Sequence, residues 1–146
     1  MRRSLLFALI LAFALPLLAV GSLLAPTNFS AVLSGGVISA IWDPVPDAVK
    51  YSVNIFAGYD TDADLEADVW LDYDFGTSDR TDGALMSDPY LDIPFADLVL
   101  EVDTDLDGVP DAFYDPISVE AKVKALGPGK GAGRQDNPFS DPVVVL

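Results

Sequence analysis

One run of acidic residues in this chain has the residue types and the spacing to bind a metal ion. It reads Asp103-Thr104-Asp105-Leu106-Asp107-Gly108-Val109-Pro110-Asp111. Carboxylates at positions 1, 3, 5 and 9, a glycine at position 6 and a backbone carbonyl at position 7 are typical of the front of a calcium loop. Gly108 permits the sharp turn that brings the Val109 carbonyl toward the same cation. The predicted ligands are Asp103, Asp105, Asp107, the Val109 carbonyl and Asp111.

The far end of this run departs from a full EF-hand. Position 12, where a bidentate glutamate closes the EF-hand shell, is Tyr114, and Asp115 follows one place late. We therefore expect loose calcium binding, with a dissociation constant of about 0.1–1 mM as in extracellular modules. Without an ion the carboxylates repel one another, so binding should order the loop. The alternative is a solvated acidic loop between two strands.

A second acidic segment, residues 60–68, has a weaker metal-binding pattern. Its acidic residues fall at every second position: Asp60, Asp62, Asp64, Glu66 and Asp68. Leu65 stands where the glycine belongs. In a strand, all the acidic side chains would share one face, which is costly without counter-ions. We expect a solvated acidic stretch here; a metal role of its own, or ligands supplied to the 103–111 loop, are the alternatives.

The charge of the chain is concentrated in its centre. The 146 residues include 8 basic and 23 acidic residues, for a net charge of −15, and neither histidine nor cysteine. This composition excludes disulfides, a thiol nucleophile, a Ser-His-Asp triad and a Cys/His zinc site. The negative field repels nucleic acid and attracts cations. Residues 60–115 hold 18 acidic residues and one basic residue, whereas residues 22–59 and 116–146 together hold five of each.

No arrangement of residues points to catalysis. Carboxylates at this density will place some pair about 5–10 Å apart by chance, so their abundance does not indicate a glycosidase-like pair. The glycine-rich segment 127–133 lacks the Gly-Lys-Ser/Thr ending of a phosphate loop. We therefore expect a protein that is not an enzyme. A small hydrolase, or an accessory domain encoded separately from its enzyme, is the least favoured alternative.

The N-terminal segment is typical of an exported protein. Arg2 and Arg3 precede an apolar run over residues 5–20, and small residues surround Gly21. This pattern predicts a signal peptide, residues 1–21, that is cleaved after Gly21. An uncleaved anchor is the alternative, because the run falls just short of the roughly 18 apolar residues of a membrane span. We expect a secreted protein, extracellular or periplasmic, with no membrane span after cleavage.

Strand signals dominate the rest of the chain. Apolar and polar residues alternate over residues 51–55, 69–75 and 117–125, Ile38, Ala40 and Trp42 recur at every second position of a further strand, and residues 143–146 would form a last short strand. No segment keeps a helical period for more than about a turn. These features predict an all-β, antiparallel β-sandwich over residues 22–146 with a long acidic insertion at about 60–115.

The nearly neutral flanks resemble a known family. The segments that carry the resemblance are Pro26-Thr27-Asn28-Phe29-Ser30-Ala31, Ile38-Ser39-Ala40-Ile41-Trp42-Asp43-Pro44-Val45, Ala48-Val49-Lys50-Tyr51-Ser52-Val53, Val119-Glu120-Ala121-Lys122-Val123-Lys124-Ala125-Leu126 and Phe139-Ser140-Asp141-Pro142. They resemble the first half and the last two strands of a fibronectin type III domain. The resemblance implies an immunoglobulin-like sandwich of seven strands, with Trp42 buried under the strand that holds Tyr51. The acidic centre is far longer than the middle strands of that family.

Two further features bear on function. The string Asp107-Gly108-Val109-Pro110-Asp111 resembles the acidic repeats of thrombospondin type 3 and of bacterial surface proteins, which implies calcium binding. Trp70 falls on the polar face of its strand, where it could stack on a sugar ring beside carboxylates or lie under a neighbouring loop. We expect a calcium-stabilised, exported binding module with a protein or glycan partner. A carbohydrate-binding module that uses Trp70 is the alternative.

Overall fold

The computed structural model describes residues 23–76, 89–127 and 137–146, and its regular structure there is nearly all strand. The elements are β1 (Ser30–Ser34), β2 (Val37–Ile41), β3 (Lys50–Tyr59), β4 (Val69–Gly76), β5 (Tyr90–Pro94), the 3₁₀ turn η1 (Phe95–Leu98), β6 (Leu100–Val102), β7 (Ala112–Tyr114), β8 (Ser118–Leu126) and β9 (Val143–Val144). The all-β class is confirmed. The predicted signal peptide lies outside the described residues, and no helix within them is long and apolar enough to cross a membrane.

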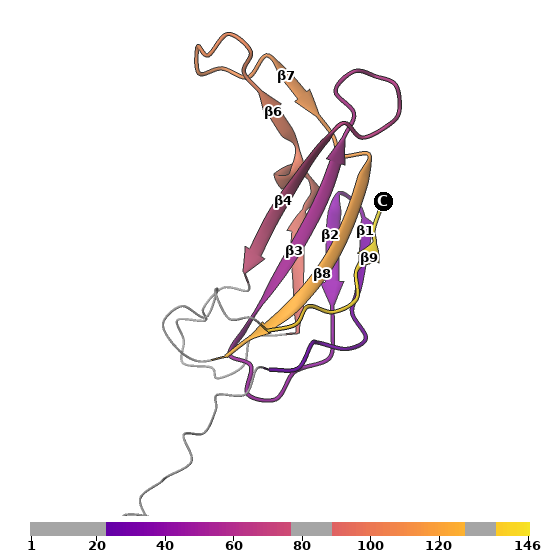
Figure 1. Cartoon of the computed structure of the whole chain (residues 1–146), viewed down its shortest axis with the longest axis vertical. Helices are drawn as coiled ribbons and strands as arrows, with labels where there is room; N and C mark the ends of the chain where they lie inside the picture. The colour runs from indigo at the N-terminus through magenta and orange to yellow at the C-terminus, as the bar shows by residue number, and fades with distance from the viewer. Residues whose placement is uncertain (1–22, 77–88, 128–136) are drawn as a thin grey trace, which may run out of the picture.

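The strands form two main sheets and one separate hairpin. The order is β1-β2-β5 in the three-stranded sheet and β4-β3-β8-β9 in the four-stranded sheet, and β6 pairs with β7 alone. All these pairings are antiparallel. Figure 1 shows the four-stranded sheet in front of the three-stranded one, with the β6-β7 hairpin extending beyond one end. The acidic centre therefore supplies β4 and β5 to the main sheets, and the hairpin is its extra part.

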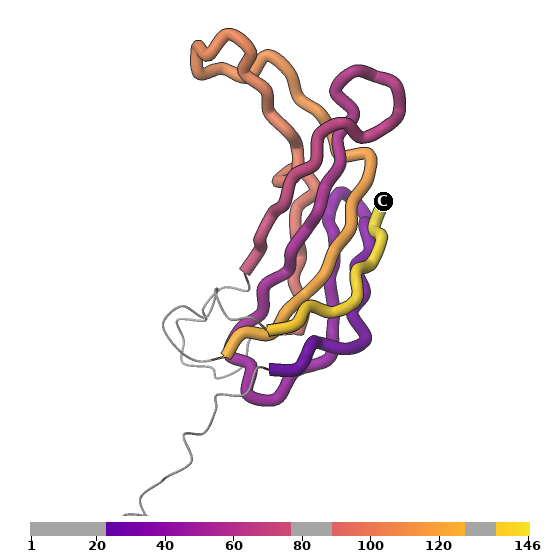
Figure 2. Tube along the Cα trace, viewed as in Figure 1, coloured from indigo at the N-terminus to yellow at the C-terminus, as the bar shows by residue number. Residues whose placement is uncertain are grey.

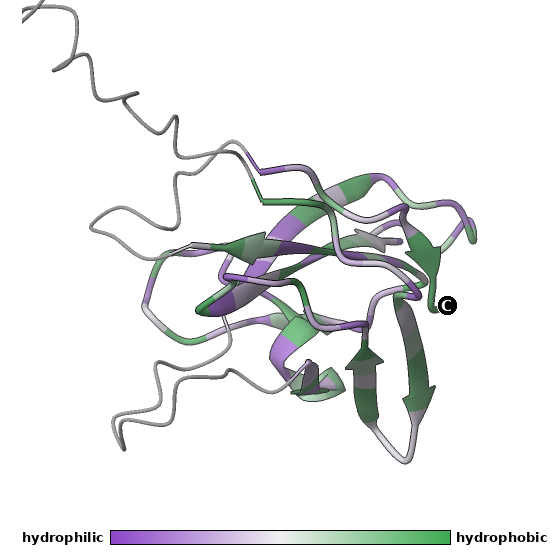
Figure 3. Cartoon of the chain, turned by 90° about the horizontal axis from the view of Figure 1, so that it is seen from below, coloured by the Kyte–Doolittle hydropathy of each residue, from purple (hydrophilic) through white to green (hydrophobic). Residues whose placement is uncertain are grey.

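The core lies between the two main sheets. Apolar and polar residues alternate along β4 and β8, which turns one face of each strand inward, and Figure 3 shows strands along which hydrophobic and hydrophilic segments alternate. Ile38 and Ile93 come from the three-stranded sheet, and Val53, Ile55 and Val123 come from the four-stranded sheet. All five are at most 1% exposed. The period-two pattern of the sequence is thus the pattern of burial.

Trp42 is buried against the strand that holds Tyr51, as expected. It follows β2 directly, is only 5% exposed, and meets the Tyr51 ring edge-on with centroids 5.0 Å apart. The Tyr51 hydroxyl accepts a hydrogen bond from the Val45 N–H at 2.8 Å. This bond holds the proline-containing turn between β2 and β3 against the core.

Tyr59 connects the main sheets to the base of the hairpin. It ends β3, is fully buried, and donates its hydroxyl to the Leu98 carbonyl of η1 at 2.5 Å. The Tyr73 hydroxyl of β4 lies 2.7 Å from the Tyr59 hydroxyl. Burial raises the pKa of Tyr59 well above its ordinary value, so the hydroxyl stays protonated. Because Leu98 leads directly into β6, Tyr59 fixes where both acidic segments begin.

Candidate metal centre

Each acidic segment is the loop of an antiparallel hairpin. Residues 60–68 join β3 to β4, and residues 103–111 join β6 to β7. The last residue of each loop donates its N–H across the hairpin base: Asp68 to the Tyr59 carbonyl at 2.9 Å and Asp111 to the Val102 carbonyl at 2.8 Å. Figures 1 and 2 show both loops at the same end of the molecule. Residues 60–68 therefore form a loop that turns back on itself, and their acidic side chains do not share one face of a strand.

The two loops have the same sequence pattern. Both read Asp-Thr-Asp-x-Asp-x-x-x-Asp, so positions 1, 2, 3, 5 and 9 are identical. The paired residues are Asp60 and Asp103, Thr61 and Thr104, Asp62 and Asp105, Asp64 and Asp107, and Asp68 and Asp111. The prediction placed weight on the missing glycine of the 60–68 loop. It missed this repeat, which was the stronger signal in the sequence.

The first carboxylate of each loop is held by the backbone. Asp60 accepts the N–H of Ala63 at 2.7 Å and that of Leu65 at 2.8 Å. Asp103 accepts the N–H groups at the same two positions of its own loop, again at 2.7 and 2.8 Å. These bonds stabilise the ionised carboxylates and so lower the pKa of both aspartates. The bond that contributes most comes from the Leu65 N–H for Asp60 and from the Gly108 N–H for Asp103.

The last carboxylate of each loop binds the threonine at position 2. Asp68 accepts the Thr61 N–H at 3.0 Å and the Thr61 hydroxyl at 2.6 Å. Asp111 accepts the Thr104 N–H at 2.7 Å and also the Thr104 hydroxyl. The threonine hydroxyl is the main cause that lowers the pKa of each of these two aspartates. Both ends of each loop therefore keep an ionised carboxylate at neutral pH.

The backbone takes the same turn in both loops even where glycine is missing. At position 4, φ is +67° for Ala63 and +61° for Leu106; at position 6, φ is +71° for Leu65 and +88° for Gly108. The left-handed conformation costs a non-glycine residue about 1–2 kcal/mol. Leu65 thus adopts the left-handed conformation that Gly108 adopts in the other loop, because the side-chain hydrogen bonds of Asp60 hold the turn.

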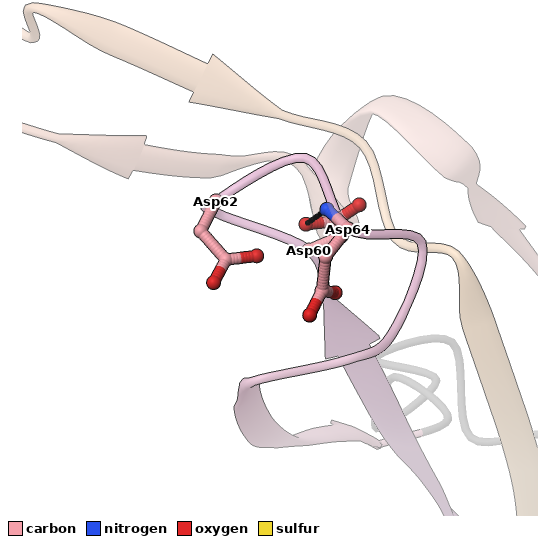
Figure 4. A group of neighbouring side chains, drawn as sticks. All are labelled: Asp60, Asp62 and Asp64. Atoms are coloured by element: carbon pink, nitrogen blue, oxygen red, sulfur yellow. Dashed lines mark hydrogen bonds between the residues drawn. The ribbon is translucent and has the colours of Figure 1, made fainter.

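Three carboxylates gather in each loop. Oxygens of Asp60, Asp62 and Asp64 lie within 4.8 Å of one another (Figure 4). In the other loop, oxygens of Asp103, Asp105 and Asp111 lie within 4.8 Å of one another. The first aspartate of each group is half-buried and the other two are exposed. Either group could hold a metal ion, since oxygens at this separation can converge on one hard cation.

The remaining predicted ligands lie outside these groups. Asp107 is not one of the three grouped carboxylates, and its side chain accepts the Val109 N–H at 2.8 Å. Asp115 is exposed and belongs to neither group, whereas Tyr114 pairs with Leu100 in the hairpin. The full ligand set of the 103–111 loop therefore stays a prediction.

Like charges are held close together in the 60–68 loop. Repulsion from Asp64 is the main cause that raises the pKa of Asp62. The pKa of Asp60, the first carboxylate of the same group, is instead lowered, because backbone N–H groups donate to it. A cation between these carboxylates would remove the repulsion at Asp62 without removing the hydrogen bonds of Asp60.

Trp70 lies on the outer face of the four-stranded sheet, as predicted from the alternation along its strand. It shares that face with Asp72 and Asp74 and is 44% exposed. It stacks on Phe56, with centroids 4.8 Å apart and ring planes 18° apart. The prediction did not include Phe56, which stands within an otherwise buried run of β3.

No protein-family model matches the chain, and no curated protein is similar to it in sequence.

Proposed function

We propose that this protein is an exported, non-catalytic interaction module whose two acidic loops bind calcium. One observation carries the proposal: the same nine-residue pattern, with the same hydrogen bonds at positions 1, 2 and 9, occurs twice. Each copy gathers three carboxylates, from positions 1, 3 and 5 in the 60–68 loop and from positions 1, 3 and 9 in the 103–111 loop. The hydrogen bonds consume only some of the carboxylate oxygens. The remaining oxygens are hard ligands on exposed loops, which suit calcium better than the smaller magnesium ion with its demand for octahedral geometry.

The role of the ion would be structural. Each loop concentrates negative charge at its tip, in a chain of net charge −15. Calcium would neutralise these tips and restrict their motion. Because Tyr59 anchors the start of the 60–68 loop and the approach to the 103–111 hairpin, both ordered loops would form one surface at the end of the sandwich. That surface would be presented to a protein or glycan partner outside the cell.

The fold proposed with this function is a fibronectin type III-like domain behind a cleaved signal peptide. Support for the domain comes from seven strands in two facing sheets and from the burial of Trp42 against the Tyr51 ring. Support for export comes from the basic and apolar N-terminal residues alone. Intact-mass measurement of the protein recovered from its host tests the cleavage after Gly21.

Thermal unfolding with and without calcium tests the metal sites. At about 10 mM calcium, a site with a dissociation constant of about 0.1–1 mM adds about 1.4–2.7 kcal/mol to the free energy of unfolding. The melting temperature should rise by several degrees over the value in EDTA. The double variant Asp103→Asn with Asp105→Asn should lose part of this rise.

The matched control changes two exposed carboxylates that lie outside both groups. Asp97→Asn with Glu101→Gln alters the net charge by the same amount and leaves the loops intact. It should keep the full calcium response. If both double variants lose the response equally, calcium acts by general screening of charge and the sites are not specific.

A further inference from the structure

The outer face of the four-stranded sheet places an aromatic side chain between two carboxylates. In the register of the strands, Phe56 of β3 lies between Asp72 of β4 and Glu120 of β8. In a neighbouring row on the same face, Asn54 lies beside Lys122. None of these residues belongs to the acidic loops, so this surface is separate from the proposed calcium sites.

A groove of about 380 Å³ opens on this face, within the range of small-ligand sites. Its lining residues are Asn54, Phe56, Asp72, Glu120, Ala121, Lys122 and Pro142. The residues come from β3, β4, β8 and the segment before β9. A rigid sheet therefore supplies most of the lining, and the positions of the side chains are set by strand register.

The aromatic surface at the groove extends beyond the lining residue Phe56 to Trp70. Phe56 is 36% exposed and stacks on Trp70. Trp70 lies against the backbone of Gly58, where an added Cβ would come within 2.9 Å of the indole ring. A glycine at this place thus lets the ring lie close to the sheet beside Phe56. The result is a continuous aromatic surface next to the polar groove.

The polar part of the groove offers both acceptors and donors. The carboxylates of Asp72 and Glu120 accept hydrogen bonds, and the ammonium group of Lys122 donates them. Asn54 donates to the Tyr73 carbonyl at 3.2 Å, and its side-chain oxygen is a buried acceptor with no hydrogen-bond partner among the described residues. The Lys122 ammonium also lies over the Phe139 ring, 4.7 Å from its centroid. A ligand rich in hydroxyl groups could bind the two exposed carboxylates and the ammonium group of Lys122.

We propose that this groove binds a neutral oligosaccharide. A sugar ring has an apolar C–H face, which packs on an aromatic ring, and a rim of hydroxyl groups that both donate and accept. The charges of the groove disfavour an acidic glycan, which would meet Asp72, Glu120 and the net charge of −15. A basic peptide would be attracted by the same charges, but the stacked rings of Phe56 and Trp70 offer the flat apolar contact that suits a sugar ring.

Affinity electrophoresis with purified protein tests the proposal. The probes are soluble β-glucan and galactomannan in native gels, and insoluble cellulose and chitin in sedimentation assays, all in EDTA so that the calcium loops do not contribute. The groove variants are Phe56→Ala and Glu120→Gln; the second keeps side-chain size at an exposed position and should fold normally. The control is Tyr90→Ala, which removes a 53% exposed aromatic residue from the other main sheet.

We expect at least one of the four polysaccharides to bind, with affinity reduced at least about tenfold in each groove variant and unchanged in the control. Absence of binding to all four overturns the proposal, as does an equal loss of affinity in Tyr90→Ala. Polylysine serves as the competing probe. If polylysine alone binds and Glu120→Gln abolishes that binding, the groove takes a cationic peptide and the glycan proposal is wrong.

Discussion

Replacing Tyr59 with phenylalanine tests how the core positions both acidic loops. The change removes one hydroxyl from a fully buried ring and leaves the ring in place. That hydroxyl donates to the Leu98 carbonyl at 2.5 Å and lies 2.7 Å from the Tyr73 hydroxyl. One buried carbonyl therefore loses its donor and one hydroxyl loses its partner.

The expected cost follows from these two bonds. A typical hydrogen bond contributes about 0.5–1.5 kcal/mol net, and a buried polar group left without a partner costs about 1–3 kcal/mol. Tyr59→Phe should therefore lower the free energy of unfolding by about 1.5–3 kcal/mol. Tyr73→Phe removes only the second bond and should cost about 0.5–1.5 kcal/mol.

Urea unfolding monitored by tryptophan fluorescence measures both losses in EDTA. The double variant should cost less than the sum of the two single variants, because both share the bond between the hydroxyls. Tyr90→Phe, at an exposed ring, should be nearly neutral. A loss below about 0.5 kcal/mol in Tyr59→Phe would refute the reasoning, since it would mean that the hydroxyl makes no buried bond to Leu98.

Three further predictions concern the core and the loops. Trp42→Ala should cost about 3–5 kcal/mol in urea unfolding, as for other buried aromatic residues, and a cost below about 1 kcal/mol would show that the indole is exposed. Leu65→Gly should raise the free energy of unfolding in EDTA and Gly108→Ala should lower it, each by up to about 1 kcal/mol, because both positions have positive φ. If both variants changed the free energy of unfolding in the same direction, the two loops would not be equivalent. The lowered pKa values of Asp103 and Asp111 mean that their contribution to stability is present above the ordinary carboxyl pKa and is lost as the pH falls through the lowered values. The melting temperature in EDTA should therefore fall as the pH drops below the ordinary carboxyl pKa of about 4, and it should fall less in Asp103→Asn with Asp111→Asn.

The sequence was sufficient to predict the long strands of the scaffold. In β3, β4 and β8, apolar and polar residues alternate over five or more consecutive positions, and the burial of Tyr51, Ile55 and Val123 follows from that alternation. The hairpin strands β6 and β7 were not predicted, because three residues are too few to define a period. Their pairing depends on the turn between them and on contacts with the core.

The acidic loops were only partly predictable. The 103–111 pattern was recognised from its aspartates and Gly108, and three of its predicted carboxylates do lie together. The 60–68 loop was underestimated because Leu65 replaces the glycine. The hydrogen bonds of Asp60 outweigh the backbone cost at that residue, and this balance depends on the three-dimensional arrangement of the loop. Direct comparison of the two segments would have revealed their shared pattern.

Calorimetric titration of calcium into EDTA-stripped protein tests the central proposal most directly. We predict saturable binding of two ions per chain that magnesium does not reproduce, and of one ion per chain in the double variant Asp103→Asn with Asp105→Asn. The double variant Asp60→Asn with Asp62→Asn should likewise retain one ion. No heat of binding in the unaltered protein, or the same stoichiometry in all three proteins, would contradict the assignment of calcium to these loops.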